Sequence, residues 1–454
     1  MTKRTNEPSR DPRDTSSVAI TERYLAYFRA RDHREIPGSP LVRPDIDTSF
    51  VIAGMQPLMP YLRGDVAPPY PRLTDWQRCL RADDADAVGS NARKLSSFHM
   101  LGNWSVGDYG RRGAIEMALD VLTNEFRLDT STLVVTTFAG DATLGLPPDD
   151  AAVAEWLRIG WPSDRIVPLG MEDNFWSTGG PGPCGPDSEI FVDFGVARGC
   201  GDPACRPGCE CDRFLEIWNL VFIEFEQQTD GQYRQLPLRS VDTGMGLERT
   251  ASVLQHVETA FDIDLFAPAL TRLREISAND TAAALDPTRR QKAQRLIVDH
   301  ARSALFAGLA GVVPGRDGRE SVPRSLIRRA ARTGRSLGLS RPFLGELLEP
   351  LTEAHDALLT PEERAATPMI ARLVTDEERG FQRVLVAGLR ELDRLRPDER
   401  GVIPGERLFI LHAERGFPSD LAGEILAERG LTVDWPGYER AMAAHREISR
   451  EGKA

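Results

Sequence analysis

Val241-Asp-Thr-Gly-Met-Gly-Leu-Glu-Arg249 is the segment of this chain with the most specific structural pattern. It reads as the end of a strand, then glycines that let backbone approach a ligand closely, then a helix that begins with Leu-Glu-Arg. At such a junction Arg249 can reach a phosphate, and Asp242 can hold an ammonium group. The segment therefore indicates a ligand site where a sheet meets a helix.

Strand patterns surround this segment in the amino-terminal half. Residues 214–225 alternate, and both faces of the run are partly apolar, as a central strand requires. Further strands are expected at three runs of β-branched or aromatic residues bounded by Gly, Pro and Asp, namely 133–137, 166–169 and 188–194. One helix is expected at 113–124. Another is expected directly after the amino-terminal tail, where apolar residues recur at helical spacing from Ile20 onward. This half is thus α and β, with a substantial sheet.

Beyond about Gln255, strand patterns nearly vanish and long helical patterns take over. The helical patterns cover 289–309, 322–337, 342–358, 368–395 and 438–450. The sequence therefore predicts three parts: a disordered tail at 1–17, a mixed α and β domain at 18–255 and a helical domain at 256–454.

The composition is that of an ordinary globular chain, with 454 residues, 41% hydrophobic and 27% charged. The longest apolar stretch, 303–314, is broken by glycines and is shorter than the roughly 18 residues that a membrane-spanning helix needs. The first 17 residues contain charges of both signs, two prolines and no apolar block, unlike a secretory signal. These features predict a cytoplasmic protein with no membrane partner.

Arginines are concentrated in one segment of a chain whose formal net charge is -12. Residues 314–342 contain eight arginines and two acidic residues. Four of the arginines fall at helical spacings on one face: Arg324, Arg328, Arg332 and Arg335. This face can follow a phosphate backbone, or it can simply be a solvated helix face.

Four of the six cysteines lie within twelve residues: Cys200, Cys205, Cys209 and Cys211. The glycines and prolines between them allow a tight loop in which four sulfurs meet. Four thiolates satisfy tetrahedral zinc and leave no open position, so the expected site is a structural Zn²⁺ site. Two disulfides or four unconnected thiols are the alternatives. The remaining cysteines, Cys79 and Cys184, are isolated and read as small core residues.

The chain lacks a phosphate-binding loop with Gly-Lys-Ser/Thr, a Gly-x-Ser-x-Gly elbow and a His-x-x-x-His pair. It contains instead several unusual segments, at 76–81, 97–108, 173–176, 182–189, 217–222 and 241–249. In this order and at these spacings, the segments resemble the catalytic domain of the alanyl-tRNA synthetase family, within the class II aminoacyl-tRNA synthetases. The similarity continues through Arg295-Leu-Ile-Val-Asp-His300 and Gly416-Phe-Pro-Ser-Asp-Leu421. The four-cysteine loop is also similar to one in many bacterial members.

The resemblance implies an α+β fold, in which an antiparallel class II sheet flanked by helices is followed by an all-helical tRNA-recognition domain. It implies that alanine and ATP, with Mg²⁺, give alanyl-adenylate, and that the alanyl group then passes to the 3′ end of tRNA. By position, Arg81 would hold the α-phosphate, and Arg249 the γ-phosphate or the adenine face. Met100 and Trp104 would lie near the adenine.

The resemblance also implies an amino-acid pocket. Asp242 would pair with the substrate ammonium. The pocket for a methyl side chain would be lined by Met55, Trp176, Asn219, Val221 and Gly244.

The sequence departs from the family pattern at several places. The family's basic loop after Arg81 is here short and acidic, at 82–87, and His99 replaces a usual glutamate. Arg316 stands where the family has residues that help to read a wobble pair in the acceptor stem, whereas the acidic partner, Asp420, is present. The tRNA contacts implied are therefore Arg316, Arg324, Arg328, Arg332 and Asp420, directed at the acceptor stem of tRNA-Ala.

The chain stops where full-length members continue into editing and carboxyl-terminal domains, so the sequence is expected to be a truncated form without editing. The leading hypothesis is an ATP-dependent alanine-tRNA ligase, as a stand-alone, specialised paralogue. The alternatives are an amino-acid-activating enzyme with a non-tRNA acceptor and a catalytically silent tRNA-binding or regulatory protein.

Overall fold

The computed structural model describes residues 14–91, 93–278 and 284–451. Residues 1–13 of the expected tail lie outside this description. Ser17 begins the first helix, α1 (Ser17–Arg29), and its hydroxyl donates to Asp264 at 2.5 Å.

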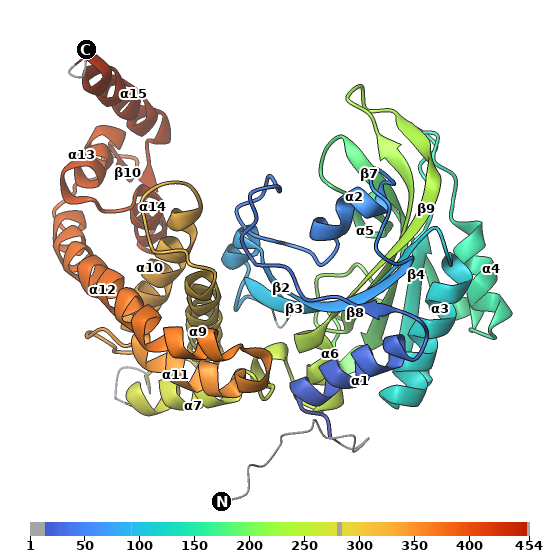
Figure 1. Ribbon diagram of the computed structural model, residues 1–454. Helices are drawn as coiled ribbons and strands as arrows, with labels where there is room; N and C mark the ends of the chain where they lie inside the picture. The colour runs from blue at the N-terminus through green and yellow to red at the C-terminus, as the bar shows by residue number, and fades with distance from the viewer. Residues whose placement is uncertain (1–13, 92, 279–283, 452–454) are drawn as a thin grey trace, which may run out of the picture.

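A curved sheet of nine strands organises the amino-terminal part of the chain (Figure 1). The strand order is β1-β2-β3-β9-β8-β7-β4-β5, with β6 paired to β7. The strands are β1 (Arg34–Glu35), β2 (Arg72–Leu80), β3 (Ser97–Val106), β4 (Leu133–Phe138), β5 (Ile166–Leu169), β6 (Phe175–Ser177), β7 (Gly182–Asp193), β8 (Phe214–Gln227) and β9 (Tyr233–Gly246). The inner pairs are antiparallel, and β1–β2 and β4–β5 are parallel.

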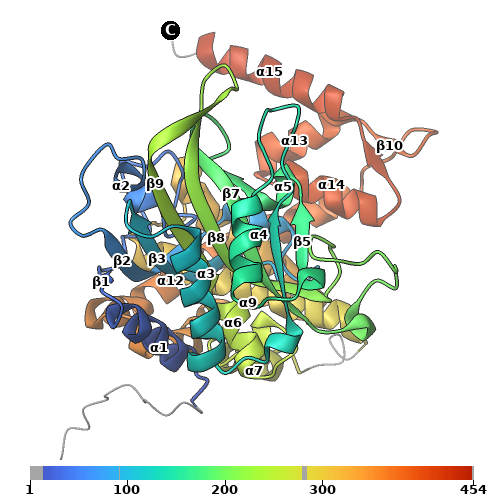
Figure 2. The same cartoon turned by 90° about the vertical axis from the view of Figure 1, so that its right-hand side faces the viewer.

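Short helices and the main core flank this sheet. The short helices are α2 (Met59–Leu62), α3 (Arg111–Asp120), α4 (Asp150–Arg158), α5 (Met171–Asn174) and α6 (Leu247–Leu254). Helices α1, α3 and α6 cover one face (Figure 2), and α1 packs there through the fully buried Tyr24 and Phe28. The other face carries a smaller apolar cluster, which includes Leu62 of α2, Leu73 and Trp104.

The rest of the described chain is mainly helical and runs from yellow-green through orange to red in Figure 1. Its helices are α7 (Ala267–Ile276), α9 (Pro287–Leu309), α10 (Ser321–Ser336), α11 (Gly345–Ala354), α12 (Pro361–Leu392), α13 (Gly405–Arg415), α14 (Ser419–Glu428) and α15 (Trp435–Glu451). The expected α+β class, an antiparallel sheet followed by a helical region, is confirmed. The helical region is not purely helical, because Val402–Ile403 (β10) pairs in parallel with Thr432–Val433 (β11). None of the described helices is long and apolar enough to cross a membrane.

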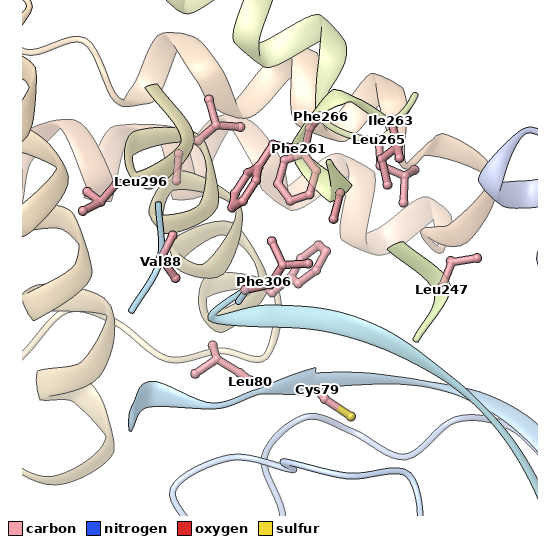
Figure 3. Packing of buried hydrophobic residues seen from close by; sticks show 14 of the residues in the cluster. Cys79, Leu80, Val88, Leu247, Phe261, Ile263, Leu265, Phe266, Leu296 and Phe306 are labelled. Atoms are coloured by element: carbon pink, nitrogen blue, oxygen red, sulfur yellow. The ribbon is translucent and has the colours of Figure 1, made fainter. Parts of the chain in front are cut away.

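Helix α9 joins the two halves. Figure 3 shows apolar side chains of α9, including Leu296 and Phe306, close to Leu80 of β2 and to Phe261 and Phe266. Inside this apolar packing, Arg302 of α9 forms a 2.7 Å ion pair with Glu248 of α6 and donates to the carbonyl of Ser97 in β3. The side chains of Arg302 and Glu248 are 0% and 1% exposed, so one buried ion pair ties the helical half to the sheet.

We expect Arg302→Met to lower the free energy of unfolding by about 3–5 kcal/mol, because it leaves the Glu248 charge buried without its cationic partner. Urea unfolding checks this value. The double variant Arg302→Met/Glu248→Gln should recover part of the loss, since it removes the orphaned charge. Arg379→Met is the matched control, because Arg379 is 56% exposed in its pair with Asp376. Equal losses in Arg302→Met and Arg379→Met would contradict the importance of the buried pair.

Candidate functional site

One face of the sheet brings together most of the residues expected in the amino-acid pocket. Strand register places Asp242 of β9 opposite both Trp104 of β3 and Val221 of β8. The next row on that face contains Gly102, Gly244 and Asn219. Because side chains alternate along a strand, residues two apart in register point to the same side.

The two glycines of this second row make room for neighbouring side chains. A Cβ added to Gly102 would clash with the indole of Trp104, and one added to Gly244 would lie 2.9 Å from the sulfur of Met100. Trp104 and Met100 can therefore lean across the sheet only because these positions have no side chain.

Asp242 is the polar group at the centre of this face. Its carboxylate accepts a 2.6 Å hydrogen bond from Nε1 of Trp104, and the residue is 5% exposed. Burial raises the pKa of Asp242 to about 7, well above the usual value near 3.8, although the indole N–H opposes this shift. A buried carboxylate with spare lone pairs suits a cationic hydrogen-bond donor.

Apolar residues that were expected in the pocket lie close together on this face. Met55, Trp104 and Val221 belong to one buried apolar cluster, and Trp176 and Met100 pack against it. Trp104 was expected beside an adenine, and it lies at the Asp242 end of the site.

The two expected phosphate-binding arginines line one cavity together with Met100 and Gly244. Nε of Arg81 donates to the carbonyl of Ile52 at 2.9 Å, and its guanidinium lies 4.8 Å from the ring centre of Phe98. Arg249 forms a 2.8 Å ion pair with Glu216 at the edge of the same cavity. The cavity thus offers two separated guanidinium groups to an anionic ligand.

Other charged residues that line this cavity were missed by the sequence reasoning. Arg93 and Lys94 add two cations, and Asp84 of the short acidic loop forms a 3.3 Å ion pair with Lys94. Asp84 follows Arg81 by three residues, whereas Arg93 and Lys94 follow it by twelve and thirteen and lie just before β3, so only Asp84 was close to that motif in the sequence.

Three carboxylates were also missed as a group: Asp187 and Glu189 of β7 and Glu216 of β8. Asp187 accepts a 2.7 Å hydrogen bond from Asn174, and Glu189 accepts one of 3.3 Å from Asn219. Burial raises the pKa of Asp187 to about 8. Burial and the nearby charges of Glu216 and Asp187 raise the pKa of Glu189. Buried carboxylates with raised pKa values are a recurring feature of functional sites.

The four expected metal ligands converge in the loop that precedes β8. The sulfurs of Cys200, Cys205, Cys209 and Cys211 all lie within 4.8 Å of one another. The sulfurs of Cys205 and Cys211 are 3.5 Å apart, and those of Cys200 and Cys209 are 3.8 Å apart. These distances are too long for an S–S bond and close to the sulfur spacing of a tetrahedral thiolate site. The four thiols can therefore hold one metal ion.

Three arginines of α10 form ion pairs within the protein, which neither interpretation of the sequence predicted. Arg324 and Arg328 both form ion pairs with Glu377 of α12, at 3.3 Å and 2.6 Å. Arg329 forms an ion pair with Asp86 of the short acidic loop. Arg332 is half-buried on the same helix.

The other two residues expected at tRNA lie outside this cluster of ion pairs. Arg316 is exposed in the loop before α10. Asp420 lies in the first turn of α14, and its side chain is outside the described atoms.

Comparisons with known proteins give concordant results. The family model described as tRNA synthetases class II (A) matches residues 19–454. Among curated proteins, the alanine–tRNA ligase of Pelotomaculum thermopropionicum is 40% identical over 451 residues, covering 96% of this chain and 49% of that protein. The alanine–tRNA ligase of Desulforamulus reducens is also 40% identical, over 442 residues and with the same two coverages. The chain thus spans about half the length of the curated relatives it matches.

Solved structures give weaker matches. A pyrrolysyl-tRNA synthetase of Desulfitobacterium hafniense aligns with TM-score 0.31 and 11% identity, over 54% of this chain and 70% of that one. The histidyl-tRNA synthetase of S. aureus aligns with TM-score 0.32 and 10% identity, over 52% and 70%.

We expect Asp242→Asn to stabilise the fold at pH 8 by about 2–4 kcal/mol and to have little effect near pH 4.5. Because burial raises the pKa of Asp242 to about 7, the folded protein keeps a proton that the unfolded chain releases above about pH 4. Wild-type stability therefore falls as pH rises from about 4 to 7, whereas the amide of the variant has no such proton to lose. Urea unfolding at pH 4.5, 6 and 8 measures the difference, with Asp376→Asn as an exposed control. A difference that does not change with pH would contradict the raised pKa.

Proposed function

Since its match spans residues 19–454, the chain belongs to the tRNA synthetases of class II (A), and we propose that it activates alanine with ATP and charges tRNA. The observation that carries this proposal is the placement of Asp242, Gly244 and Arg249 along one strand end and the helix that follows it. Names of the 40% identical relatives support alanine as the amino acid.

The amino acid would bind at the Asp242 end of the sheet face. The ionised carboxylate of Asp242 would accept from the substrate ammonium, while Trp104 holds the carboxylate in place by its 2.6 Å hydrogen bond. Met55, Val221 and Trp176 surround this position with apolar atoms, and Asn219 lies in the adjacent row. Such apolar surroundings suit a small apolar side chain such as the methyl group of alanine.

ATP would occupy the adjoining cavity, with Arg81 at the α-phosphate and Arg249 at the γ-phosphate or the adenine face. Met100 would contact the adenine, and Trp104 is assigned to the amino-acid end. The substrate carboxylate attacks the α-phosphorus, the bond to the bridging oxygen breaks, and pyrophosphate leaves. The guanidinium groups stabilise the negative charge that shifts onto the phosphate oxygens, so this chain contributes positioning and electrostatics.

Magnesium would be held where Glu216 lines this cavity, next to two further carboxylates of the neighbouring strand β7. Glu216, Glu189 and Asp187 would supply hard oxygen ligands from neighbouring strands, and burial, together with neighbouring carboxylates, raises the pKa values of Glu189 and Asp187. Bound Mg²⁺ would neutralise phosphate charge and favour pyrophosphate as a leaving group. The protein's part is to hold the three carboxylates at the phosphate end.

For the second step, we propose residues 18–255 as the catalytic domain and 256–454 as the tRNA-recognition domain. Arg316, Arg332 and Asp420 are the proposed contacts to the acceptor stem. Arg324 and Arg328 would contribute after exchange of their Glu377 partner for phosphate.

One observation favours a second candidate, transfer of the activated amino acid to an acceptor other than tRNA. The basic helix is already neutralised in part, because Glu377 pairs with two of its arginines and Asp86 with a third. A tRNA must compete with these carboxylates for the same guanidinium groups.

The four-cysteine cluster is proposed as a structural zinc site. It ends just before β8, the strand that supplies Asn219 and Val221. Four thiolates leave the metal no open position, so the metal would fix the loop and take no part in the chemistry.

The test of the proposed function is alanine-dependent exchange of pyrophosphate into ATP, followed by charging of total tRNA with each amino acid. We expect exchange with alanine and charging with alanine alone. Asp242→Ala should lower kcat/KM for alanine by at least about a hundredfold, whereas the exposed control Asp376→Asn should not. For the wild type, kcat/KM for alanine should rise as pH increases through about 7, because only ionised Asp242 pairs with the ammonium. Exchange without charging would favour the second candidate, and no exchange by folded protein would refute the proposal.

For the metal, we expect about one equivalent of zinc per chain by elemental analysis. Cys205→Ser should lose the metal and lower the melting temperature, because one of four ligands is gone. Cys184→Ser is the matched control, since Cys184 is a buried free thiol outside the cluster. Folded protein that contains no metal after expression with zinc would contradict the assignment.

A further inference from the structure

The carboxylate of Glu248, in the first turn of α6, is the meeting point of three elements. Its oxygens accept from the backbone N–H of His99 at 3.0 Å and 3.2 Å and lie 3.0 Å from Nδ1 of the same residue. Arg302 of α9 donates to it at 2.7 Å. These donors outweigh burial and lower the pKa of Glu248 to about 2, so the group is an anion at any working pH.

The tautomer of His99 follows from this charge. Burial lowers the pKa of His99, so the imidazole is neutral and carries one proton. Glu248 has no proton to donate, and therefore the 3.0 Å contact requires the proton on Nδ1 of His99. His99 is thus a hydrogen-bond donor to Glu248 from both its backbone and its ring.

The rest of the His99 ring is surrounded by other rings and has no second hydrogen bond. Trp76 and Phe306 lie 5.6 Å and 5.4 Å from the imidazole centre, and His355 lies 5.6 Å away on another side. Among the described residues, Nε2 has no hydrogen-bond partner. The charged or titratable groups that face His99 are Glu248 of α6, Arg302 of α9, Arg78 of β2 and His355 after α11.

Glu248 directly precedes Arg249, the proposed ATP-binding arginine. No side chain in the described chain caps the first turn of α6, so the helix start lacks the usual local anchor. The bonds from His99 and Arg302 take that place and fix the backbone from which the Arg249 side chain extends.

We propose that His99 is a positioning residue: its ring N–H, donated to Glu248, holds the start of α6 so that Arg249 faces the ATP cavity. The proposal rests on the proposed function, because it gives Arg249 a role at ATP. It goes beyond that function by assigning the position of the arginine to a buried imidazole on a neighbouring strand.

The direct test compares ATP dissociation constants, measured by calorimetry on variants of the whole chain. His99→Leu removes the ring donor and should weaken ATP binding about tenfold or more. His99→Asn keeps a nitrogen donor near the Nδ1 position and should stay within about threefold of the wild type. His99→Gln places its nitrogen near the Nε2 position and should behave as His99→Leu does. The KM for alanine should change by less than about twofold in all three.

His355→Leu is the matched control, because His355 is equally buried in the same aromatic cluster and its ring nitrogen bonds the carbonyl of Leu351. It should lower the melting temperature without changing ATP affinity. Unchanged ATP affinity in His99→Leu, equal losses in His99→Asn and His99→Leu, or an equal loss in His355→Leu would each overturn the proposal.

A second measurement does not depend on the folding of any variant. In protein labelled with ¹⁵N-histidine, the His99 signals should report a proton on Nδ1 at pH 7.5, and an unprotonated Nδ1 would overturn the proposal. The outcomes also separate this proposal from the proposed function. Wild-type protein that binds ATP but does not activate alanine refutes only the function, whereas wild-type protein that does not bind ATP refutes both.

Discussion

The buried ion pair between Arg302 and Glu248 is the interaction on which the rest of the structure depends. Removing two full charges from water is costly, and the cost is offset here because the Glu248 carboxylate accepts from both His99 and Arg302, and Arg302 also donates to the carbonyl of Ser97. Glu248 belongs to the helix that follows β9, Arg302 to the helical half, and His99 and Ser97 to β3. The sheet, the start of α6 and α9 therefore have one mutual arrangement. A shift in any of them would leave a charge or a backbone group unsatisfied.

Much of the fold could be predicted because it follows local periodicity. The alternation of 214–225 predicted a central strand, and β8 occupies Phe214–Gln227 between two other strands. Strands β2 and β3 were recognised only as unusual segments, and of β9 only the end was read as a strand, because polar residues and, in β3 and β9, glycines interrupt their apolar alternation. Helix α12 was expected to begin at Pro368, a residue that usually starts a helix. It begins about two turns earlier, at Pro361, where Thr360 and Glu363 form a capping box, and Pro368 lies inside it.

The candidate site shows the same contrast between local features, which the sequence reveals, and long-range contacts, which it does not. Residues close together in the sequence, such as Asp242, Gly244 and Arg249, could be assigned from one motif, since register and alternation fix their relative positions. Contacts between distant segments could not. Nothing in the spacing of the α10 arginines indicates Glu377, which lies 49 residues beyond Arg328, or Asp86, which lies 243 residues before Arg329. Likewise, Asp187 and Glu216 approach each other only because β7 and β8 are neighbours. Long-range pairing depends on the folded topology, which charge patterns in one sequence do not specify.

Under the proposed function, Gly102 and Gly244 have a consequence for how the range of amino-acid substrates could evolve. The room that Trp104 and Met100 occupy beside Asp242 exists because two adjacent positions on the sheet have no side chain. Any single substitution at either glycine adds a side chain and so reduces that room, which means that change at these two positions can make the pocket smaller but not larger. Selection for a bulkier amino acid must begin elsewhere, at Trp104 or Met100, the large side chains that lean over the glycines. Trp104 also holds Asp242, so a lineage that shortens it for space must replace a hydrogen bond at the same time.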